Sequence, residues 1–402
     1  MMVFHSVFFT FFLLVQLLFA IYMTIPLFFL CCYAFLNLFK IKSPFEKRPV
    51  LTDKNFEFGL IITAHQEPQF IIPLVDSILR QTHKNFYAYV VADDCNTDAL
   101  AFSDPRIIIL KPEPALNAKI KSIHYAIDHF IKKHDAIVIL DVDNLIHPSF
   151  LEVMNAYFQK GYKVVQADFK PKNIDTNYAR MDAMGDMFNF FIEREMRMRL
   201  GLSSAIWGSG IAIDYDLYKD VEYADFLGGF DKKLQSHLVQ RVNKIAFAPE
   251  AILFDEKITS GKSLENQRTR WISSYFKYFK ESFRIFLKGL RKANLNLIYF
   301  GFIVLRPPLF IVIGVSFLFS LIDFFISPYY FYVWLFILAG FLFSFACIVL
   351  IKGKDIRFIR TFLIIPVFAI RQTAALLKIG KAKKSFMKTQ HSKLVFISDL
   401  IK

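Results

Sequence analysis

Two aspartates, Asp141 and Asp143, stand two residues apart at the end of the apolar run DAIVILDVD. Side chains two apart on a strand point to the same side, so both carboxylates can face one ligand. A hard cation such as Mg²⁺ binds through one or two carboxylates together with substrate phosphates. Once bound, it offsets the charge that builds on a departing diphosphate. The spacing therefore predicts a divalent-cation site, for Mg²⁺ or Mn²⁺, at a strand end.

A polar cluster stands in the stretch SLENQRTRW, directly ahead of an expected helix that is aromatic on one side and basic on the other. Its members are Gln267, Arg268, Arg270 and Trp271. Basic and aromatic residues beside such a helix have a simpler explanation at a membrane surface. The arginines would then bind lipid headgroups, and the tryptophan would be an interfacial anchor.

The elements that must position these residues alternate between strand and helix. Short apolar runs, each ending in polar or acidic residues, are separated by stretches with helical spacing. This alternation predicts an α/β domain with a mostly parallel sheet and helices on both faces. Ligands of such sheets bind beyond the carboxyl ends of the strands, where Asp93 and Asp94 also stand. The sequence contains no glycine-rich phosphate loop.

Apolar residues make up 55% of the 402-residue chain, and the formal net charge is +14. A basic balance is one feature of nucleic-acid binders. Here the lysines and arginines gather beside apolar segments, which favours a lipid bilayer as the partner and argues against nucleic acid.

The apolar segments lie mainly at the two ends of the chain. Residues 1–39 carry no charged side chain and are long enough to span a bilayer, and the cations that follow place the next segment in the cytoplasm. We expect an integral protein of the bacterial inner (plasma) membrane with three spans. The expected parts are a membrane anchor at 1–40, a cytoplasmic domain at 41–270, an interfacial amphipathic helix at 271–296, a transmembrane hairpin at 297–351, and an interfacial or re-entrant helix with a cytoplasmic tail at 352–402.

The order of these motifs resembles that of the inverting family 2 glycosyltransferases, and most closely the membrane-bound branch with cellulose, chitin and hyaluronan synthases. In that branch 35 residues separate the last aspartate from a Gln-x-x-Arg-Trp motif. Here residues 232–266 separate Asp231 from Gln267 in QRTRW. The match covers roughly residues 55–275. The resemblance implies a GT-A-like α/β fold, flanked by transmembrane helices, and a hexosyltransferase of polysaccharide biosynthesis.

The resemblance also implies roles for particular residues. Asp93 and Asp94 match the pair that holds the base and ribose of a nucleotide-sugar donor, expected to be a UDP-sugar. Lys119 matches a lysine near the donor, and Asp141 and Asp143 match the metal and diphosphate motif, with Asp143 the more direct ligand. Asp231 matches the catalytic base, and Trp207–Ile213 resembles the segment that lines the acceptor pocket. Gln267, Arg270 and Trp271 match the motif that closes over the diphosphate and the acceptor sugar.

In an inverting transfer a carboxylate takes the proton of the attacking hydroxyl, and Arg268 or Arg270 would stabilise the departing diphosphate. Asp231 has an alternative reading as a helix N-terminal residue favoured by the helix dipole, because DKKLQSHLVQRV reads as helical. It also lacks the acidic neighbour usual in the family, since the chain reads GGFDKK.

The acceptor is expected to be lipid-linked or a glycan, because the QRTRW cluster stands beside the membrane. Three spans leave little room for a polymer channel, which favours transfer of a single sugar. A processive polysaccharide synthase and a catalytically silent membrane scaffold of the same fold remain as alternatives.

Overall fold

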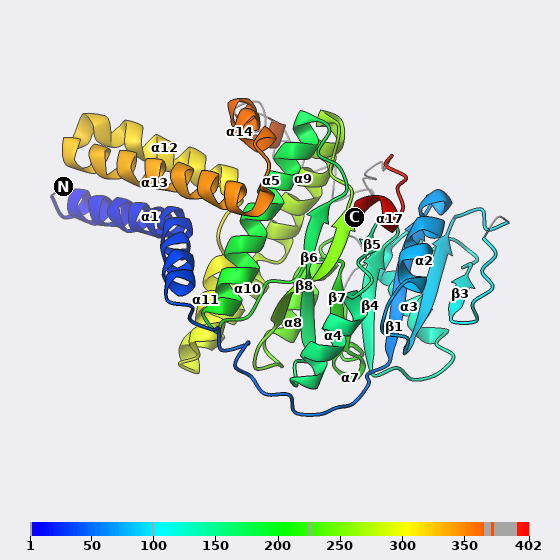
Figure 1. The fold of residues 1–402 in the computed structure, drawn as a ribbon. Coiled ribbons are helices and arrows are strands. Elements are labelled where there is room, and N and C mark those ends of the chain that lie inside the picture. The colour runs from blue at the N-terminus through cyan, green and yellow to red at the C-terminus, as the bar shows by residue number, and fades with distance from the viewer. Residues whose placement is uncertain are drawn as a thin grey trace.

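The computed structural model describes residues 2–98, 100–223, 226, 228–365, 371–373 and 392–401. Its centre is an eight-stranded sheet with the order β3-β2-β1-β4-β7-β6-β8-β5 (Figure 1). Strands β1 to β4 are parallel to one another, as are β6 and β8, whereas β7 and β5 are antiparallel to their neighbours. The strands are β1 Phe58–His65, β2 Phe86–Asp93, β3 Ile107–Leu110, β4 Ala136–Asp141, β5 Leu145–Ile146, β6 Val164–Pro171, β7 Ile211–Asp214 and β8 Ala246–Asp255.

The predicted fold class is confirmed, and the five apolar runs predicted as strands form β1 to β4 and β6. Strands β5, β7 and β8 were not predicted. β5 and β7 span only two and four residues, too few to show a periodicity. β8 contains exposed Pro249 and Glu250, where its pairing with β6 shifts register, and such a bulge breaks the strand pattern.

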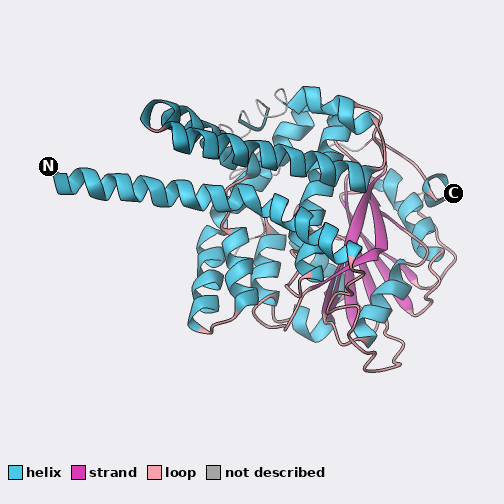
Figure 2. Ribbon diagram, turned by 60° about the vertical axis from the view of Figure 1, so that its left-hand side comes forward, coloured by secondary structure: helices cyan, strands magenta, loops and turns pink. Residues whose placement is uncertain are grey.

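Helices cover both faces of the sheet (Figures 1 and 2). One hydrophobic core joins the sheet to α2 and α4, and a second joins its other face to α3, α8, α10 and α11. The helices of this domain are α2 Ile71–Leu79, α3 Lys119–Asp128, α4 Phe150–Gln159, α5 Asn177–Phe190, α6 Met196–Arg199, α7 Tyr215–Tyr218, α8 Phe230–Leu238, α9 Gly261–Lys277, α10 Phe279–Arg291 and α11 Leu295–Val304.

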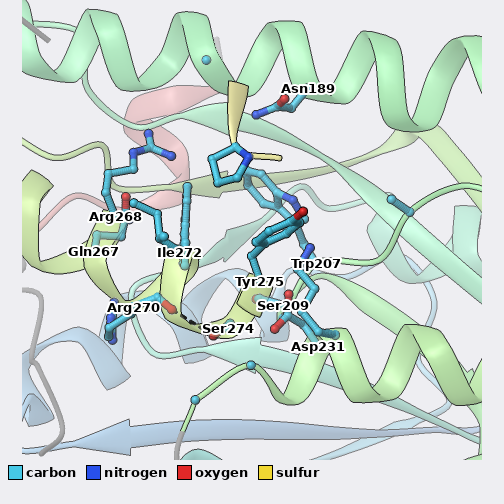
Figure 3. Close-up of a pocket in the computed structure, with 18 of the residues that line it drawn as sticks. Asn189, Trp207, Ser209, Asp231, Gln267, Arg268, Arg270, Ile272, Ser274 and Tyr275 are labelled. Carbon is cyan, nitrogen blue, oxygen red and sulfur yellow. Dashed lines mark hydrogen bonds between the residues drawn. The ribbon is translucent and has the colours of Figure 1, made fainter. Parts of the chain in front are cut away.

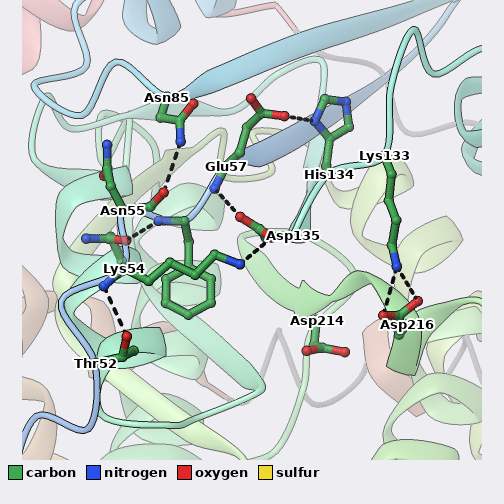
Figure 4. A network of polar contacts seen from close by, with 12 residues as sticks. Thr52, Lys54, Asn55, Glu57, Asn85, Lys133, His134, Asp135, Asp214 and Asp216 are labelled. Carbon is green, nitrogen blue, oxygen red and sulfur yellow. Dashed lines mark hydrogen bonds and ion pairs between the residues drawn. The ribbon is translucent and has the colours of Figure 1, made fainter.

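A polar network fixes the amino ends of β1 and β4, at the edge of the sheet opposite the predicted site (Figure 4). Glu57 accepts a hydrogen bond from His134 Nδ1 at 2.8 Å, and Glu57 N donates to Asp135 Oδ2 at 2.9 Å. Asp135 also pairs with Lys54 at 2.6 Å. Because these bonds set the register of the two strands, they also set where both strands end.

Three helices of the described chain are long and apolar enough to cross a membrane, which agrees with the predicted number of spans. They belong to α1 Met2–Leu38, α12 Leu309–Ile326 and α13 Pro328–Gly353. All three extend from the same side of the sheet domain and pack against one another and against α5 (Figure 1). Helix α1 contains Pro26, and it bends along its length, as an internal proline explains.

The segment expected as one amphipathic helix at 271–296 is divided in the structure. Helix α9 already contains the QRTRW cluster and ends at Lys277, and α10 begins at Phe279. Tyr278, between them, has the non-helical angles φ −101° and ψ 14°. Helix α11 then packs tightly on α10, since a Cβ added to Gly289 would lie 2.5 Å from the Ile298 nitrogen. The predicted hairpin thus starts with this separate short helix, ahead of Arg306.

The C-terminal part contains the short helices α14 Arg357–Thr361 and α17 Ile397–Leu400. The expected interfacial or re-entrant helix at 352–402 falls largely on residues 366–370 and 374–391, which lie outside the described residues.

Candidate active site

A cavity of about 950 Å³ opens at the carboxyl ends of the parallel strands and reaches the first turns of α12. Nine of the ten predicted site residues line it: Asp93, Lys119, Asp141, Asp143, Asp231, Gln267, Arg268, Arg270 and Trp271. Residues more than 170 positions apart in the chain therefore meet in one cavity. This is the place where open α/β sheets bind their ligands.

Asp93 and Asp94, at the end of β2, have different environments. Asp93 is 1% exposed and lines the cavity. Its carboxylate is hydrogen-bonded to three groups, Leu116 N at 2.6 Å, Asn117 N at 2.9 Å and His65 Nδ1 at 2.8 Å. Asp94 is exposed, bonds to Gln66 Nε2 at 2.7 Å, and is the one predicted residue outside the cavity lining. Asp93 therefore anchors the loop that leads to α3, and one acceptor position of its carboxylate remains for a ligand.

Lys119, the first residue of α3, joins two walls of the cavity. Its ammonium donates hydrogen bonds to Asp141 Oδ1, at the end of β4, and to the Gly208 carbonyl oxygen at 2.7 Å. It also lies 5.0 Å from the ring centroid of Phe230, the first residue of α8. The lysine thereby holds the acidic strand end close to the helix that carries Asp231.

Asp143 is 7% exposed and lies beside the end of β8. Its Oδ2 accepts from Glu256 N and its Oδ1 from Asn144 Nδ2, each at 3.4 Å, and Lys172 donates to its backbone carbonyl. Nearby Asp255 also lines the cavity, and burial raises the pKa of Asp255 to about 7 although the charge of Lys257 opposes this shift. The strand ends thus carry more acidic groups than the predicted pair.

Whether this part of the cavity can bind a cation depends on the side chains that could act as its ligands. Within the described residues, no group of three or more His, Cys, Asp or Glu side chains is arranged to hold a metal ion. Asp141 and Asp143 nevertheless present two carboxylates to one cavity. Mg²⁺ and Mn²⁺ accept such a site when substrate phosphates and water supply the other oxygens, so the residues fit a substrate-dependent cation.

Asp231 lies in the first turn of α8, and its side chain also lines the cavity. The residue before the helix is Gly229, whose φ of +70° suits glycine and whose added Cβ would lie 2.8 Å from the Tyr278 ring. A Cβ added to Gly208, the residue that Lys119 contacts, would lie 3.8 Å from the Asp231 Cβ. Asp231 is therefore both a residue of a helix N-terminus and a residue of the cavity lining.

The QRTRW cluster lies in the middle of α9 and forms one wall of the cavity (Figure 3). Arg268 donates to Asp182 Oδ1 at 2.7 Å, and its guanidinium lies 4.3 Å from the Trp271 ring centroid. Gln267 Oε1 is buried without a hydrogen-bond partner in the described structure. Burial lowers the pKa of Arg270, and the charge of Asp141, which lines the same cavity, partly offsets this.

Trp271 is 40% exposed and lies 6.2 Å, centroid to centroid, from Trp207 in the segment expected to line the acceptor pocket. Figure 3 shows Gln267 and Arg268 on one side of the pocket and Trp207 and Asp231 on the other. The two tryptophans thus form an aromatic surface between the QRTRW helix and the start of α8.

Two residues that support the site were not predicted. Asp182 on α5 is 3% exposed and holds Arg268, and Lys257 is 2% exposed and contacts both Asp186 and Asp255. Asp182 and Asp186 stand four residues apart on α5, so they lie on the same face of the helix, and this spacing was the sequence signal for a buried cation beside α5.

The far end of the cavity lies among the helices that are candidate membrane spans. Phe310, Ile313 and Gly314 of α12 and Phe341, Leu342 and Phe345 of α13 line this end. The cavity therefore changes from acidic and polar at the sheet to apolar between α12 and α13.

Comparisons with known proteins agree with this fold and site. A sequence profile described as Glycosyltransferase like family 2 matches residues 55–274, more than half of the chain. No curated protein sequence matches the chain. The fold resembles the mannosyltransferase PcManGT from Pyrobaculum calidifontis, solved with GDP-Man and Mn²⁺, with a TM-score of 0.53 and 14% identity over 91% of this chain and 99% of that one.

The structure of S. aureus TarS residues 1–349 with UDP-GlcNAc is a more distant match, with a TM-score of 0.38 and 13% identity over 51% of this chain and 59% of that one. At these identities the structural likenesses concern the fold alone. The profile match covers the sheet, α3, α8 and nearly all of α9, and it includes all the predicted site residues. The chain belongs to the glycosyltransferase-like family 2.

Proposed function

We propose that the protein is a membrane-bound, inverting glycosyltransferase that moves one sugar from a nucleotide-diphosphate donor, expected to be a UDP-sugar, to a lipid-linked acceptor. We also propose that its sheet domain faces the cytoplasm of a bacterial cell. One observation carries the proposal. A single cavity contains the acidic strand ends, Asp231 and the QRTRW cluster, and it continues between α12 and α13.

The polar end of this cavity suits the donor. Asp93 offers an acceptor atom for the nucleoside, Lys119 contacts Asp141, and Arg270 lines the same cavity within the field of the Asp141 charge, where a diphosphate would lie. Arginine binds phosphate oxygens in a fixed fork, which favours Arg270 over an ammonium group for the departing diphosphate. Asp141 and Asp143 would hold a divalent cation, which would supply positive charge against the diphosphate when bound. The Mn²⁺ bound by PcManGT supports this use of a cation.

The transfer itself needs one base. An acceptor hydroxyl oxygen forms a bond to the anomeric carbon while the bond from that carbon to the diphosphate oxygen breaks, and Asp231 takes the hydroxyl proton. The sugar is thereby inverted, and no second carboxylate has to form a covalent intermediate. Trp207 lies on the same side of the pocket as Asp231, and Trp271 lies 6.2 Å from Trp207, centroid to centroid, so both offer apolar faces to the acceptor sugar.

A panel of labelled sugar nucleotides tests the proposal. Membranes containing the full chain are incubated with each donor, and product size separates one addition from the many additions of a processive synthase. Asp231→Asn should retain donor binding while turnover falls by about 10²–10⁴-fold. Equal turnover in that variant would remove Asp231 from its role. Donor binding that survives both chelation of divalent cations and Asp143→Ala would refute the cation site, and no transfer from any donor would favour a silent scaffold.

A further inference from the structure

Arg197 is a buried cation without an acceptor for its N–H groups. It is 1% exposed and lines the cavity, and Nε, Nη1 and Nη2 all lack a hydrogen-bond partner among the described residues. Its guanidinium lies 4.6 Å from the Phe300 ring centroid and 5.5 Å from that of Tyr299. The faces of these rings attract the cation. The N–H groups lie in the plane of the guanidinium, so they do not find an acceptor in the rings.

Further positive charge surrounds Arg197. Arg306 donates to Glu193 Oε1 at 2.8 Å, while its own Nη1 is buried without a partner in the described chain. Burial alone would raise the pKa of Glu193, yet the pKa is lowered, because the charges of Arg306, Arg194, Lys232 and Arg197 outweigh burial. Glu193 thus faces four cations, and Asp186 and Asp168 also act on Arg194. Arg197 and Arg306 keep N–H groups without an acceptor among the described residues, which leaves room for an anion beside these two arginines.

The backbone shows how the cluster is assembled. Residues Phe191–Glu195 form a π-helical turn between α5 and α6, and such turns are frequent at functional sites. The turn presents Glu193 to the cavity just before Arg197. Arg306 comes from the segment between α11 and α12, so two distant parts of the chain supply the guanidinium groups.

We propose that Arg197 and Arg306 bind the phosphate or diphosphate headgroup of the lipid acceptor. This deepens the proposed function and rests on it. A guanidinium matches phosphate oxygens bidentately, and a buried one without an acceptor is costly, so an anionic ligand explains its presence at the cavity wall.

The path of the lipid tail follows from the position of Arg306. This residue stands three positions before Leu309, where the candidate span α12 begins. Beyond it the cavity lining becomes apolar, with Phe310, Ile313 and Phe341. Gly314 belongs to the same lining, and a Cβ added there would meet nothing within 4 Å. An amphipathic ligand with its phosphate at Arg306 can therefore extend its tail between α12 and α13.

The same ligand would reach the reacting group. Lys232, whose charge acts on Glu193, directly follows Asp231 in α8. Arg197 and Asp231 line the same cavity, so a headgroup at Arg197 shares that cavity with the base and leaves the acidic end to the donor. The two ends of one cavity are thereby assigned to two substrates.

Binding to the purified full-length protein without donor tests the inference. Farnesyl phosphate, farnesyl diphosphate and farnesol share one tail and differ only in phosphate. Both phosphorylated lipids should bind at least about tenfold more tightly than farnesol, and Arg197→Met should remove that difference. Arg199→Met is the matched control, because Arg199 lies on the same short helix outside the cavity lining and should bind like the wild type. Equal affinity of Arg197→Met and wild type would overturn the site.

A stability measurement separates this role from a structural one. Without lipid, Arg197→Met should melt at the wild-type temperature or above it, because the variant removes a buried charge that lacks a partner. A lower melting temperature together with unchanged lipid affinity would make Arg197 structural. Phosphatidylglycerol competing as strongly as farnesyl phosphate would assign the site to bulk phospholipid and overturn the acceptor role.

A second variant tests the tail. Gly314→Trp should weaken farnesyl phosphate binding, whereas Leu318→Trp, on the same helix but at a 51% exposed position outside the lining, should not. Labelled sugar nucleotide binding is measured in every variant. If the wild type binds no sugar nucleotide, the proposed function fails. If donor binding is intact but the arginine variant binds lipid phosphate normally, only this inference fails.

Discussion

Replacing Lys257 with methionine removes the cation of a buried ion network beneath the cavity. Lys257 is 2% exposed, and its ammonium contacts Asp186 Oδ2 as well as Asp255 at 2.7 Å. Asp186 Oδ1 has no hydrogen-bond partner in the described structure. Methionine keeps most of the apolar stem, so the main effect is to remove the ammonium that pairs with buried Asp186 and with Asp255, whose side chain is 17% exposed.

The magnitude depends on pH. Removing one member of a buried ion pair costs about 3–5 kcal/mol. Burial raises the pKa of Asp255 from 3.8 to about 7 against the charge of Lys257, so the loss of Lys257 raises this pKa further. At pH values between the unfolded and folded pKa of Asp255, the folded chain binds more protons than the unfolded chain. The stability of the folded chain therefore falls as pH rises. We expect Lys257→Met to cost about 1–2 kcal/mol at pH 5 and about 3–5 kcal/mol at pH 8.

Urea unfolding in detergent, followed by tryptophan fluorescence at both pH values, measures this difference. The control is the triple variant Lys257→Met, Asp186→Asn, Asp255→Asn, which removes the whole charge network. It should lie within about 1–2 kcal/mol of the wild type, because replacing all members leaves no unpaired buried charge. A single variant as stable as the wild type at pH 8, or a triple variant no more stable than the single one, would refute the reasoning.

Other predictions concern the opposite edge of the sheet, the α10–α11 contact and the QRTRW wall. Burial lowers the pKa of His134 although Glu57 opposes this, so the wild type should lose thermal stability as pH falls below 6.5, and His134→Gln should flatten that dependence. Gly289→Val should cost at least about 2 kcal/mol in urea unfolding, because its Cβ would meet backbone at 2.5 Å; Gly314→Val, with open space, should not. Asp182→Asn should lower kcat about tenfold by releasing Arg268, with thermal stability showing whether the fold survives.

Five of the eight strands were predictable from the sequence, because most of them are largely buried and read as continuous apolar runs. Strands such as β4, with five of six residues buried, leave no other interpretation of AIVILD. The acidic residues that end these runs had to meet at one edge, since parallel strands end together. The three candidate spans were equally clear, because length and the absence of charge define them.

The supporting residues were not predictable in the same way. Asp182 and Arg268 are 86 positions apart, and only the packing of α5 against α9 brings them together. Glu193, Arg197 and Arg306 form their cluster across a π-helical turn and an interhelical segment, neither of which has a local sequence pattern. The QRTRW motif was placed ahead of its helix for a related reason. Its polar residues interrupt the amphipathic pattern, although they lie on the cavity side of one continuous helix.

The change in polarity along the cavity indicates which substrate binds at which end. At the sheet end, Asp93 and Asp141 offer acceptors for a nucleoside and a substrate-bound cation, and the residues that α12 and α13 contribute to the far end are apolar. A soluble glycan acceptor would leave that apolar end without a function and Arg197 without an anion. A phosphorylated lipid would occupy both and would place its headgroup beside Asp231. The proposed base then lies between the two substrates, where a single displacement requires it.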